Sequence, residues 1–198
     1  MDPLKQMPIS DKKDLREEFL NERHKISPVV EQHYAAEIAS KVINNFDLTD
    51  KVVAGYWPVR GEADIRPVLM HLANRDVVCS LPIIAKENEP LLFRRWTNTV
   101  AMVEGAHEIP VPDKNDPVAE IVTPDVLLVP LVAYDRKGYR LGYGGGYYDR
   151  TITALREKKA VETIGIGFSV QKAFDLLPAE DHDVPLDYVV TERMIDRF

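Results

Sequence analysis

Five of the ten glycines in the chain lie within nine residues, between positions 138 and 146. The same segment holds Arg140 and leads into Tyr147, Tyr148 and Asp149. Glycines let backbone N–H groups turn toward an anion, and a guanidinium can grip two phosphate oxygens at once. Neither G-x-G-x-x-G nor G-x-x-x-x-G-K-[ST] fits the segment. The loop predicts phosphate binding of a less common design, and the alternative is a tight turn that needs positive φ angles.

Two groups of carboxylates accompany this loop. Asp149 follows it at the predicted start of a helix, where a carboxylate either caps the helix or holds Mg²⁺ beside a phosphate. The spacing alone leaves both roles open. A second acidic cluster, at residues 178–183, contains His182 and Asp183. No second His or Cys stands at a spacing typical of a transition-metal site, so a solvated loop is the simpler interpretation of that cluster.

The surrounding sequence predicts the elements that position the loop. Apolar residues recur at helical spacing in the first 46 residues and predict two helices, the second starting at Ser27-Pro28. Strands are predicted at 52–57, 76–84, 91–96, 125–133, 163–168 and 187–191, helices at 67–73 and 147–159, and a loop at 104–117. The alternation predicts an α/β fold: a single three-layer α/β/α domain over residues 1–198 with a mostly parallel sheet. Ligands bind at the carboxyl ends of such strands, and the glycine loop follows the apolar strand 125–133.

Composition narrows the class of protein. Twenty-five Lys and Arg residues against 32 Asp and Glu give a net charge of −7, which argues against duplex nucleic-acid binding. The single cysteine, Cys79, lies in an apolar run and predicts a buried strand position in a reducing compartment. No apolar run is long enough for a membrane span, and residues 1–6 lack the apolar core of a signal peptide. We expect a cytoplasmic monomer without nucleic-acid or membrane partners.

Residues 129–150 resemble the signature of the 5-formyltetrahydrofolate cyclo-ligase family, also called methenyltetrahydrofolate synthetases. The specific part is the string RLGYGGGYYD at positions 140–149. Other features of the family follow in order: KKDLR at 12–16, Glu62, Gln171, and the pair His182 and Asp183. The resemblance covers the chain from about residue 12 to residue 192.

The resemblance implies a fold similar to the sugar-phosphate isomerase and CoA-transferase type of sheet. It also implies use of ATP and Mg²⁺ to convert 5-formyltetrahydrofolate into 5,10-methenyltetrahydrofolate, with release of ADP and phosphate. Lys12 and Arg140 would be catalytic, and Asp149 and Asp183 would hold the metal. ATP contacts would come from Lys12, Lys13, Asp14, Leu15, Arg16, Arg140, Leu141, Gly142, Tyr143, Gly144, Gly145, Gly146, Tyr147 and Tyr148. Folate contacts would come from Trp57, Glu62, Tyr143, Gly144, Gly145, Gly146 and Tyr147.

One segment departs from the family pattern. Members often have a tryptophan and a glutamate between prolines where this chain reads AHEIPVP at 106–112. Two other classes of function stay open. One is a module of the same fold that binds nucleotide or folate without turnover. The other is a phosphosugar isomerase or transferase, which would ignore ATP and need an acid/base or nucleophilic carboxylate at a strand end.

Overall fold

The computed structural model describes residues 11–198, so residues 1–10 of the predicted domain lie outside the described part. The α-helices of the described part are α1 (Lys12–His24), α2 (Pro28–Asn45), α3 (Arg66–Ala73) and α4 (Tyr147–Arg156), with short 3₁₀ turns η1 (Ala106–Glu108) and η2 (Ser169–Gln171). The strands are β1 (Val52–Ala54), β2 (Val78–Ile83), β3 (Leu92–Trp96), β4 (Met102–Glu104), β5 (Pro110–Pro112), β6 (Ile121–Val122), β7 (Val126–Pro130), β8 (Ala133–Tyr134), β9 (Arg140–Leu141), β10 (Glu162–Ile166), β11 (Tyr188–Val190) and β12 (Ile195–Arg197).

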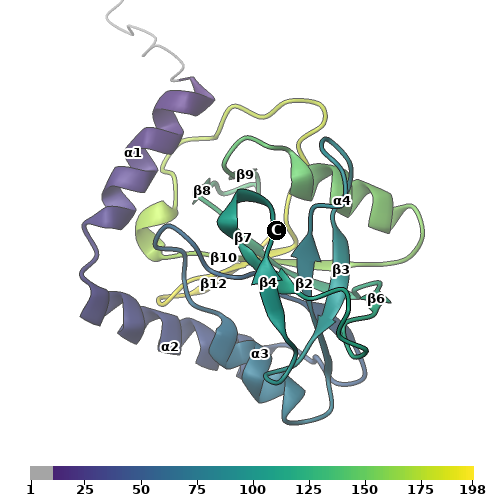
Figure 1. The fold of residues 1–198 in the computed structure, drawn as a ribbon. Helices are drawn as coiled ribbons and strands as arrows, with labels where there is room; N and C mark the ends of the chain where they lie inside the picture. Colours follow the sequence, from purple (N-terminus) through teal and green to yellow (C-terminus); the bar gives the residue numbers. More distant parts are fainter. Residues whose placement is uncertain (1–10) are drawn as a thin grey trace, which may run out of the picture.

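Eight of these strands form one sheet in the order β12-β11-β10-β7-β1-β2-β3-β6. The five strands from β11 to β2 are parallel. At the edges, β12 pairs antiparallel with β11, β3 with β2, and β6 with β3. Helices lie on both sides of this sheet (Figure 1). The predicted α/β class with a mostly parallel sheet is confirmed.

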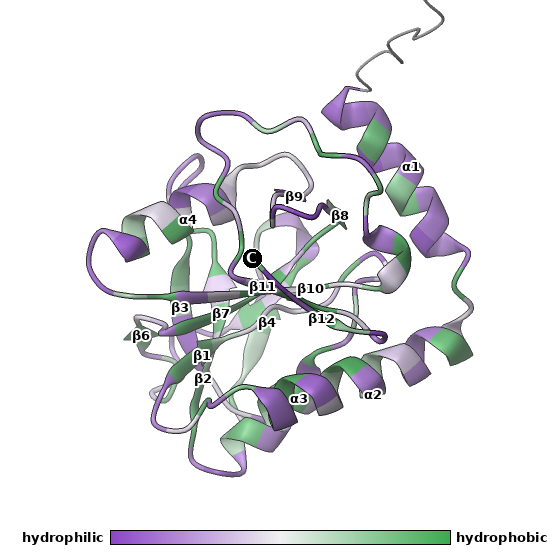
Figure 2. Cartoon of the chain, turned by 180° about the vertical axis from the view of Figure 1, so that it is seen from behind, coloured by the Kyte–Doolittle hydropathy of each residue, from purple (hydrophilic) through white to green (hydrophobic). Residues whose placement is uncertain are grey.

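Side chains of the central strands alternate between two cores, because successive residues of a strand point to opposite faces. In β7, Val126 and Leu128 pack in the core beneath α2 and α3, whereas Leu127 and Val129 pack in the core beneath α4. Figure 2 shows the central strands largely in green. Along α2, green and purple alternate, as expected for a helix with one buried face. A strand buried on both faces is apolar throughout, which is why 125–133 was recognisable in the sequence.

Helix α1 lies at the edge where the parallel strands end. Asp11 caps it by accepting a hydrogen bond from the backbone N–H of Lys13 at 3.3 Å. Leu15 and Phe19 pack on a small third core that includes Val132 and Leu141. This packing fixes the first turns of α1 beside the segment that carries the glycines.

The predicted strand 125–133 is shorter than expected, since β7 ends at Pro130. The next two carbonyl oxygens, of Leu131 and Val132, accept hydrogen bonds from the side-chain amide of Gln171 at 2.7 and 3.0 Å. These bonds take the place of strand-to-strand hydrogen bonds with β10. The chain then leaves the main sheet and forms the separate two-stranded sheet β8–β9. The glycine loop therefore follows β9 rather than the long central strand.

The prediction of a loop at 104–117 is wrong over part of its length, where β4 and β5 form a hairpin. Pro110 and Pro112 lie opposite Glu104 and Met102. The N–H groups of Gly105 and Asp113 donate to the carbonyls of Ile109 and Ala101, so the residue pairs on either side of the prolines are hydrogen-bonded. The prolines therefore occupy the alternate pairs of the ladder, where no N–H is needed. Three further short strands, β6, β9 and β12, were also missed. Over residues 11–198, no helix is long and apolar enough to cross a membrane.

Candidate active site

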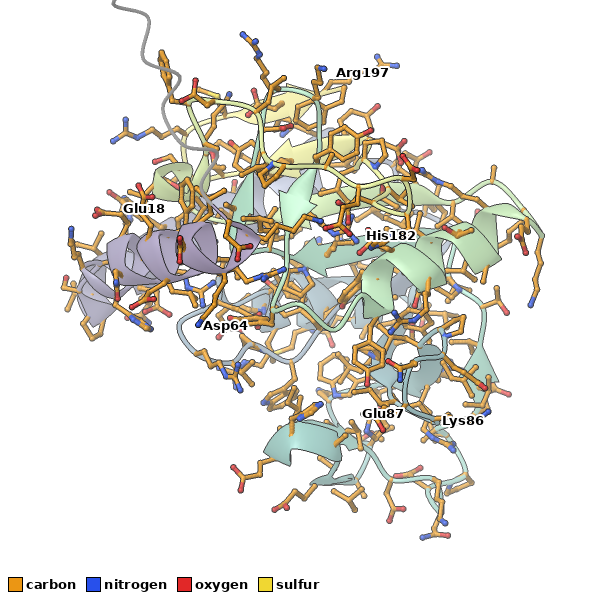
Figure 3. The ribbon with its side chains drawn as sticks, turned by 90° about the horizontal axis from the view of Figure 1, so that it is seen from above. Glu18, Asp64, Lys86, Glu87, His182 and Arg197 are labelled. Atoms are coloured by element: carbon orange, nitrogen blue, oxygen red, sulfur yellow. The ribbon has the colours of Figure 1, made fainter. Side chains whose placement is uncertain are left out.

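A cavity of about 320 Å³ opens between α1, the glycine loop, the start of α4 and the loop before β11. Its walls are Lys12, Arg16, Arg140, Leu141, Gly142, Tyr143, Gly144, Gly145, Gly146, Tyr147, Tyr148, Asp149, Glu180, His182 and Asp183. Figure 3 shows His182 on the loop that runs beside α4. Segments more than 160 residues apart in the sequence thus meet around one space at the carboxyl-end side of the sheet.

The glycine loop presents free backbone N–H groups. Among residues 11–198, no group accepts a hydrogen bond from the N–H of any residue in Gly142–Gly146. Two carbonyl oxygens of the loop are held instead: Arg16 Nε donates to Gly142 at 2.8 Å, and Arg150 donates to Gly145 at 2.7 Å. With carbonyls tied to arginines and N–H groups left without partners, the loop has the character of an anion-binding nest.

Backbone conformation explains only some of the glycines. Gly144 and Gly146 have φ angles of +98° and +63°, a region that other residues rarely adopt. Gly142 has no such requirement, and a Cβ placed there would meet no atom within 4 Å. The tight-turn interpretation therefore accounts for Gly144 and Gly146. It does not account for Gly142, which lines the cavity.

Arg140 and Asp149 form a buried ion pair at the floor of the cavity. The Arg140 side chain is 4% exposed, and one nitrogen lies 3.0 Å from Asp149 Oδ1 while another donates to the Val184 carbonyl at 2.7 Å. Asp149 Oδ1 also accepts from the Val184 N–H at 3.1 Å. Burial lowers the pKa of Arg140, and the Asp149 charge opposes this effect. The pair ties the loop before β11 to the start of α4.

Lys12 faces the same cavity from α1, where it pairs with two carboxylates. Its Nζ lies 2.6 Å from Asp183 and 3.1 Å from Glu180. Burial alone would lower the pKa of Lys12, but hydrogen bonds to Asp183 and Glu180 raise it above its usual value. Burial would likewise raise the pKa of Asp183, but the hydrogen bonds from Lys12 and from the Glu180 N–H, together with the Lys12 charge, outweigh burial and lower it. Both groups are therefore held in their charged forms.

The carboxylates predicted to bind magnesium, Asp149 and Asp183, each have an oxygen that could act as a metal ligand. The hydrogen bonds to Asp149 go to Oδ1, and those to Asp183 go to Oδ2. One oxygen of each therefore lies outside these bonds, and both residues line the cavity. In the described part of the chain no three His, Cys, Asp or Glu residues cluster as a metal cage. Mg²⁺ needs no cage, because it takes one or two carboxylates and completes its shell with phosphate oxygens and water.

A second polar group lies behind the glycine loop. Glu62 is buried after β1, and its Oε2 accepts from the Val59 N–H at 3.0 Å. Tyr143, which is 39% exposed, accepts a hydrogen bond from Arg23 at 2.7 Å through its hydroxyl. Burial raises the pKa of Glu62, and the Val59 N–H, Arg23 and the Tyr143 hydroxyl oppose this rise. A buried carboxyl group thus lies next to an exposed aromatic ring.

The structure brings together most of the predicted residues, but not all of them. The glycine-loop residues, Arg140, Lys12, Arg16 and both predicted metal ligands line the cavity. The cavity walls do not include Lys13, Asp14, Leu15, Trp57 and Glu62. Leu15 packs in a core, and Trp57 stacks against the Arg66 guanidinium at 5.2 Å. Their assigned contacts stay predictions.

Sequence reasoning missed Arg23. It looks like one more charged residue of an amphipathic helix, yet it is 3% exposed. Nothing in the spacing of α1 distinguishes it from its solvated neighbours. Its partners are Leu131, Arg60 and Tyr143, each distant in sequence. Only the tertiary arrangement reveals it.

Comparisons with known proteins identify the family of the chain. A family model described as the 5-formyltetrahydrofolate cyclo-ligase family matches residues 8–192. A protein of Haemophilus influenzae named 5-formyltetrahydrofolate cyclo-ligase is 30% identical over 167 residues, which cover 83% of this chain and 84% of that protein. The Escherichia coli K12 protein of the same name is 31% identical over 173 residues, covering 85% and 93%.

Solved structures give the same result. The 5,10-methenyltetrahydrofolate synthetase of Aquifex aeolicus has a TM-score of 0.79 at 29% identity, with 94% of this chain and 92% of that one covered. A 5,10-methenyltetrahydrofolate synthetase of Mycoplasma pneumoniae has a TM-score of 0.73 at 25% identity, covering 92% and 99%. The chain therefore belongs to the 5-formyltetrahydrofolate cyclo-ligase family of enzymes.

Proposed function

We propose that this enzyme converts 5-formyltetrahydrofolate and ATP into 5,10-methenyltetrahydrofolate, ADP and phosphate, with Mg²⁺. The observation that carries the proposal is the row of five backbone N–H groups, Gly142–Gly146, which have no acceptor among residues 11–198. They lie in one cavity with the cations Lys12 and Arg16. Tyr143, Gly144 and Gly145 are exposed, so an anionic ligand that enters the cavity can accept hydrogen bonds from several of these N–H groups at once. A triphosphate has the required charge and number of oxygens.

The nucleotide phosphates would occupy the glycine-loop end of the cavity. The loop N–H groups and the start of α4 would face the phosphate oxygens, because both carry partial positive charge. Lys12 and Arg16 would approach from α1. Arg16 already orders the loop through its bond to Gly142. Arg140 would face the phosphates from the floor of the cavity. Its bonds to Asp149 and Val184 hold its guanidinium in one orientation. Such fixed charges need no reorganisation when charge develops on a transferring phosphoryl group.

The chemistry requires activation of a poor electrophile. The formyl oxygen attacks the γ-phosphorus, and the bond from that phosphorus to the bridging oxygen breaks, which releases ADP. The neighbouring N10 amine then attacks the activated carbon and loses its proton, and the C–O bond breaks to release phosphate and leave the methenyl cation. No covalent bond to the protein is needed. The residues must align the two substrates and neutralise the phosphoryl oxygens, which is the role proposed for Lys12, Arg140 and the loop.

Asp149 and Asp183 would hold the magnesium ion through the oxygens that the hydrogen bonds leave free. When bound, the ion neutralises part of the triphosphate charge. Asp149 would meanwhile keep its bond to Arg140, so that one carboxylate fixes a guanidinium and a metal ligand together. Asp183 would exchange Lys12 for the ion, which releases the ammonium group toward the phosphates.

The folate would lie beside Tyr143 with its pterin near Glu62. A flat ring system packs on an exposed aromatic side chain, and a buried carboxylate accepts N–H hydrogen bonds from a heterocycle. The side chain of Glu62 lies among Val59, Arg23 and Tyr143, directly behind the glycine loop. This position would place the formyl group between the pterin pocket and the phosphate end of the cavity.

A direct assay tests the proposal. The protein is mixed with 5-formyltetrahydrofolate and Mg-ATP, and the absorbance of the methenyl product is followed together with ADP release. Both signals should rise in equal amounts and should stop when Mg²⁺ is chelated. Binding of ATP and folate without product would favour the non-catalytic module. Failure to bind ATP would favour the phosphosugar class.

Replacing Glu62 by glutamine should weaken folate affinity about tenfold to hundredfold, because a buried partner lost from a hydrogen bond costs about 1–3 kcal/mol. ATP affinity should stay the same, since the phosphates bind at the glycine loop. Calorimetric titration with each ligand measures both effects. Asp64→Asn is the matched control, because this carboxylate lies in the same loop and pairs with Arg66 instead. Equal losses for ATP and folate in the Glu62 variant would mean a distorted site and would contradict the assignment.

We also propose that the described chain acts as one domain, as a monomer in the cytoplasm, without nucleic-acid or membrane partners. The cavity supports a single domain, because α1, the glycine loop and the segment before β11 all contribute walls to it. The net charge of −7 supports the absence of a nucleic-acid partner. Gel filtration with light scattering tests the monomer.

A further inference from the structure

Arg23 is a buried cation at the junction of three segments. Its guanidinium donates to the Arg60 carbonyl at 2.7 Å, to the Leu131 carbonyl at 3.4 Å and to the Tyr143 hydroxyl at 2.7 Å. It thereby joins α1 to the loop after β1, to the end of β7 and to the glycine loop. No carboxylate forms an ion pair with it among residues 11–198. A buried charge without an ion-pair partner is costly, so a structural role alone is a poor reason to keep it.

The bond to Tyr143 has a defined direction. A guanidinium has five N–H donors and no acceptor, so the tyrosine oxygen must accept from Arg23. The proton of the Tyr143 hydroxyl is then free to point elsewhere. Glu62 is the anionic acceptor beside it, and both Tyr143 and Arg23 stabilise its carboxylate. The three groups form a chain in which Arg23 orients Tyr143 and Tyr143 faces Glu62.

The charge of Glu62 depends on groups from several elements. Arg23 comes from α1, Tyr143 from the glycine loop and Arg60 from its own loop, and all three favour the carboxylate. Tyr56 at the end of β1 and Tyr148 in α4 also feel the Glu62 charge. Asp64 lies on the same loop, which passes beside α1 (Figure 3), but it is paired with Arg66. Arg23 is the buried member of the two cations that face Glu62, since Arg60 is exposed.

We propose that Arg23 is a positioning residue for folate: its guanidinium holds the Tyr143 hydroxyl and the Arg60 carbonyl together, so that the Tyr143 ring and the Glu62 side chain meet the pterin in a fixed arrangement. This inference rests on the proposed function. It also explains how the two ends of the site stay aligned. One helix, α1, carries Lys12 and Arg16 toward the phosphates and Arg23 toward the folate, so the distance between the two ends is set by a rigid element.

The test compares Arg23→Met and Arg23→Lys with the wild-type enzyme in titrations with 5-formyltetrahydrofolate between pH 5.5 and 8.5, and with ATP. Loss of the cation raises the pKa of Glu62, so folate affinity should fall as the pH is lowered, at a higher pH than in the wild type. We expect the midpoint of this profile to lie at a higher pH in Arg23→Met than in the wild type, with weaker folate binding on the acidic side. Arg23→Lys, which keeps the charge, should shift the midpoint less.

Several outcomes decide the matter. ATP affinity close to that of the wild type in both variants supports the inference. An unchanged pH profile in Arg23→Lys and Arg23→Met, or equal losses for ATP and folate, overturns it. If Arg23→Met does not fold, Tyr143→Phe replaces it, and a folate midpoint identical to that of the wild type overturns the inference. A wild-type enzyme that does not bind folate refutes the proposed function itself. Loss of affinity in Glu62→Gln but not in the Arg23 variants refutes only the role of Arg23.

Discussion

Replacing Arg140 by methionine is expected to abolish most turnover and to lower the free energy of unfolding by about 3–5 kcal/mol. The reason is the environment of its partner. Asp149 is 19% exposed and its Oδ1 accepts from Arg140, so the methionine leaves a carboxylate with little access to water and no counter-charge. The Val184 carbonyl also loses its donor. The loop before β11 then loses its link to β9, and the cavity loses a fixed cation.

A double variant separates the structural effect from the catalytic one. In Arg140→Met combined with Asp149→Asn, no unpaired buried charge remains, so part of the stability should return, by about 1–3 kcal/mol. Turnover should not return, because the cation and the predicted metal ligand are both gone. Urea unfolding measures the first quantity and steady-state kinetics the second. If the double variant regained both stability and activity, Arg140 and Asp149 would be purely structural. Arg140→Lys should also lose at least about tenfold in activity, since an ammonium cannot bond Asp149 and Val184 in the fork geometry.

The glycine loop and the sheet could be predicted from sequence because their causes are local. Five glycines in nine residues, followed by a carboxylate at a helix start, already indicate a loop whose N–H groups face a ligand. The strand β7 was evident because it is buried on both faces and therefore apolar throughout. The partners of the charged groups were not predictable. Lys12 meets Asp183 across 171 residues, and no periodicity relates them.

The errors have physical causes as well. Prolines usually exclude a strand, and the β4–β5 hairpin escaped prediction because its two prolines occupy the non-hydrogen-bonded positions of a two-stranded ribbon. The end of β7 could not be seen because it depends on Gln171, whose side chain takes the carbonyl oxygens of Leu131 and Val132. At the end of β7 a contact from outside the segment therefore decides the conformation. Arg23 was overlooked for the same reason.

Replacing Lys12 by methionine is expected to lower kcat/KM for ATP by about a hundredfold to a thousandfold, the usual effect of removing one fixed group that stabilises a transition state. The loss of stability should be smaller than in Arg140→Met, because Lys12 is 17% exposed whereas Arg140 is 4% exposed, and because Asp183 keeps its bond from the Glu180 N–H. Folate affinity should be unchanged, since Lys12 lies at the phosphate end. Lys25→Met is the control: it removes the same charge at the far end of α1, where the side chain is 69% exposed. Equal effects of the two variants would mean that only net charge matters.

Asp183→Asn distinguishes a phosphate contact by Lys12 from a merely structural pair. In the ligand-free enzyme, Lys12 and Asp183 neutralise each other at 2.6 Å. If Lys12 turns to the phosphates when ATP binds, removal of the Asp183 charge should free the ammonium group and strengthen binding of ATP in the absence of Mg²⁺, by several-fold. With Mg²⁺ present the same variant should bind ATP less tightly, because one predicted metal ligand is lost. Stronger ATP binding without Mg²⁺ and weaker ATP binding with it would require that Asp183 both restrains Lys12 and holds the metal ion. A variant that weakens ATP binding under both conditions would show that Asp183 serves to hold Lys12 in place, and that the partner exchange does not occur.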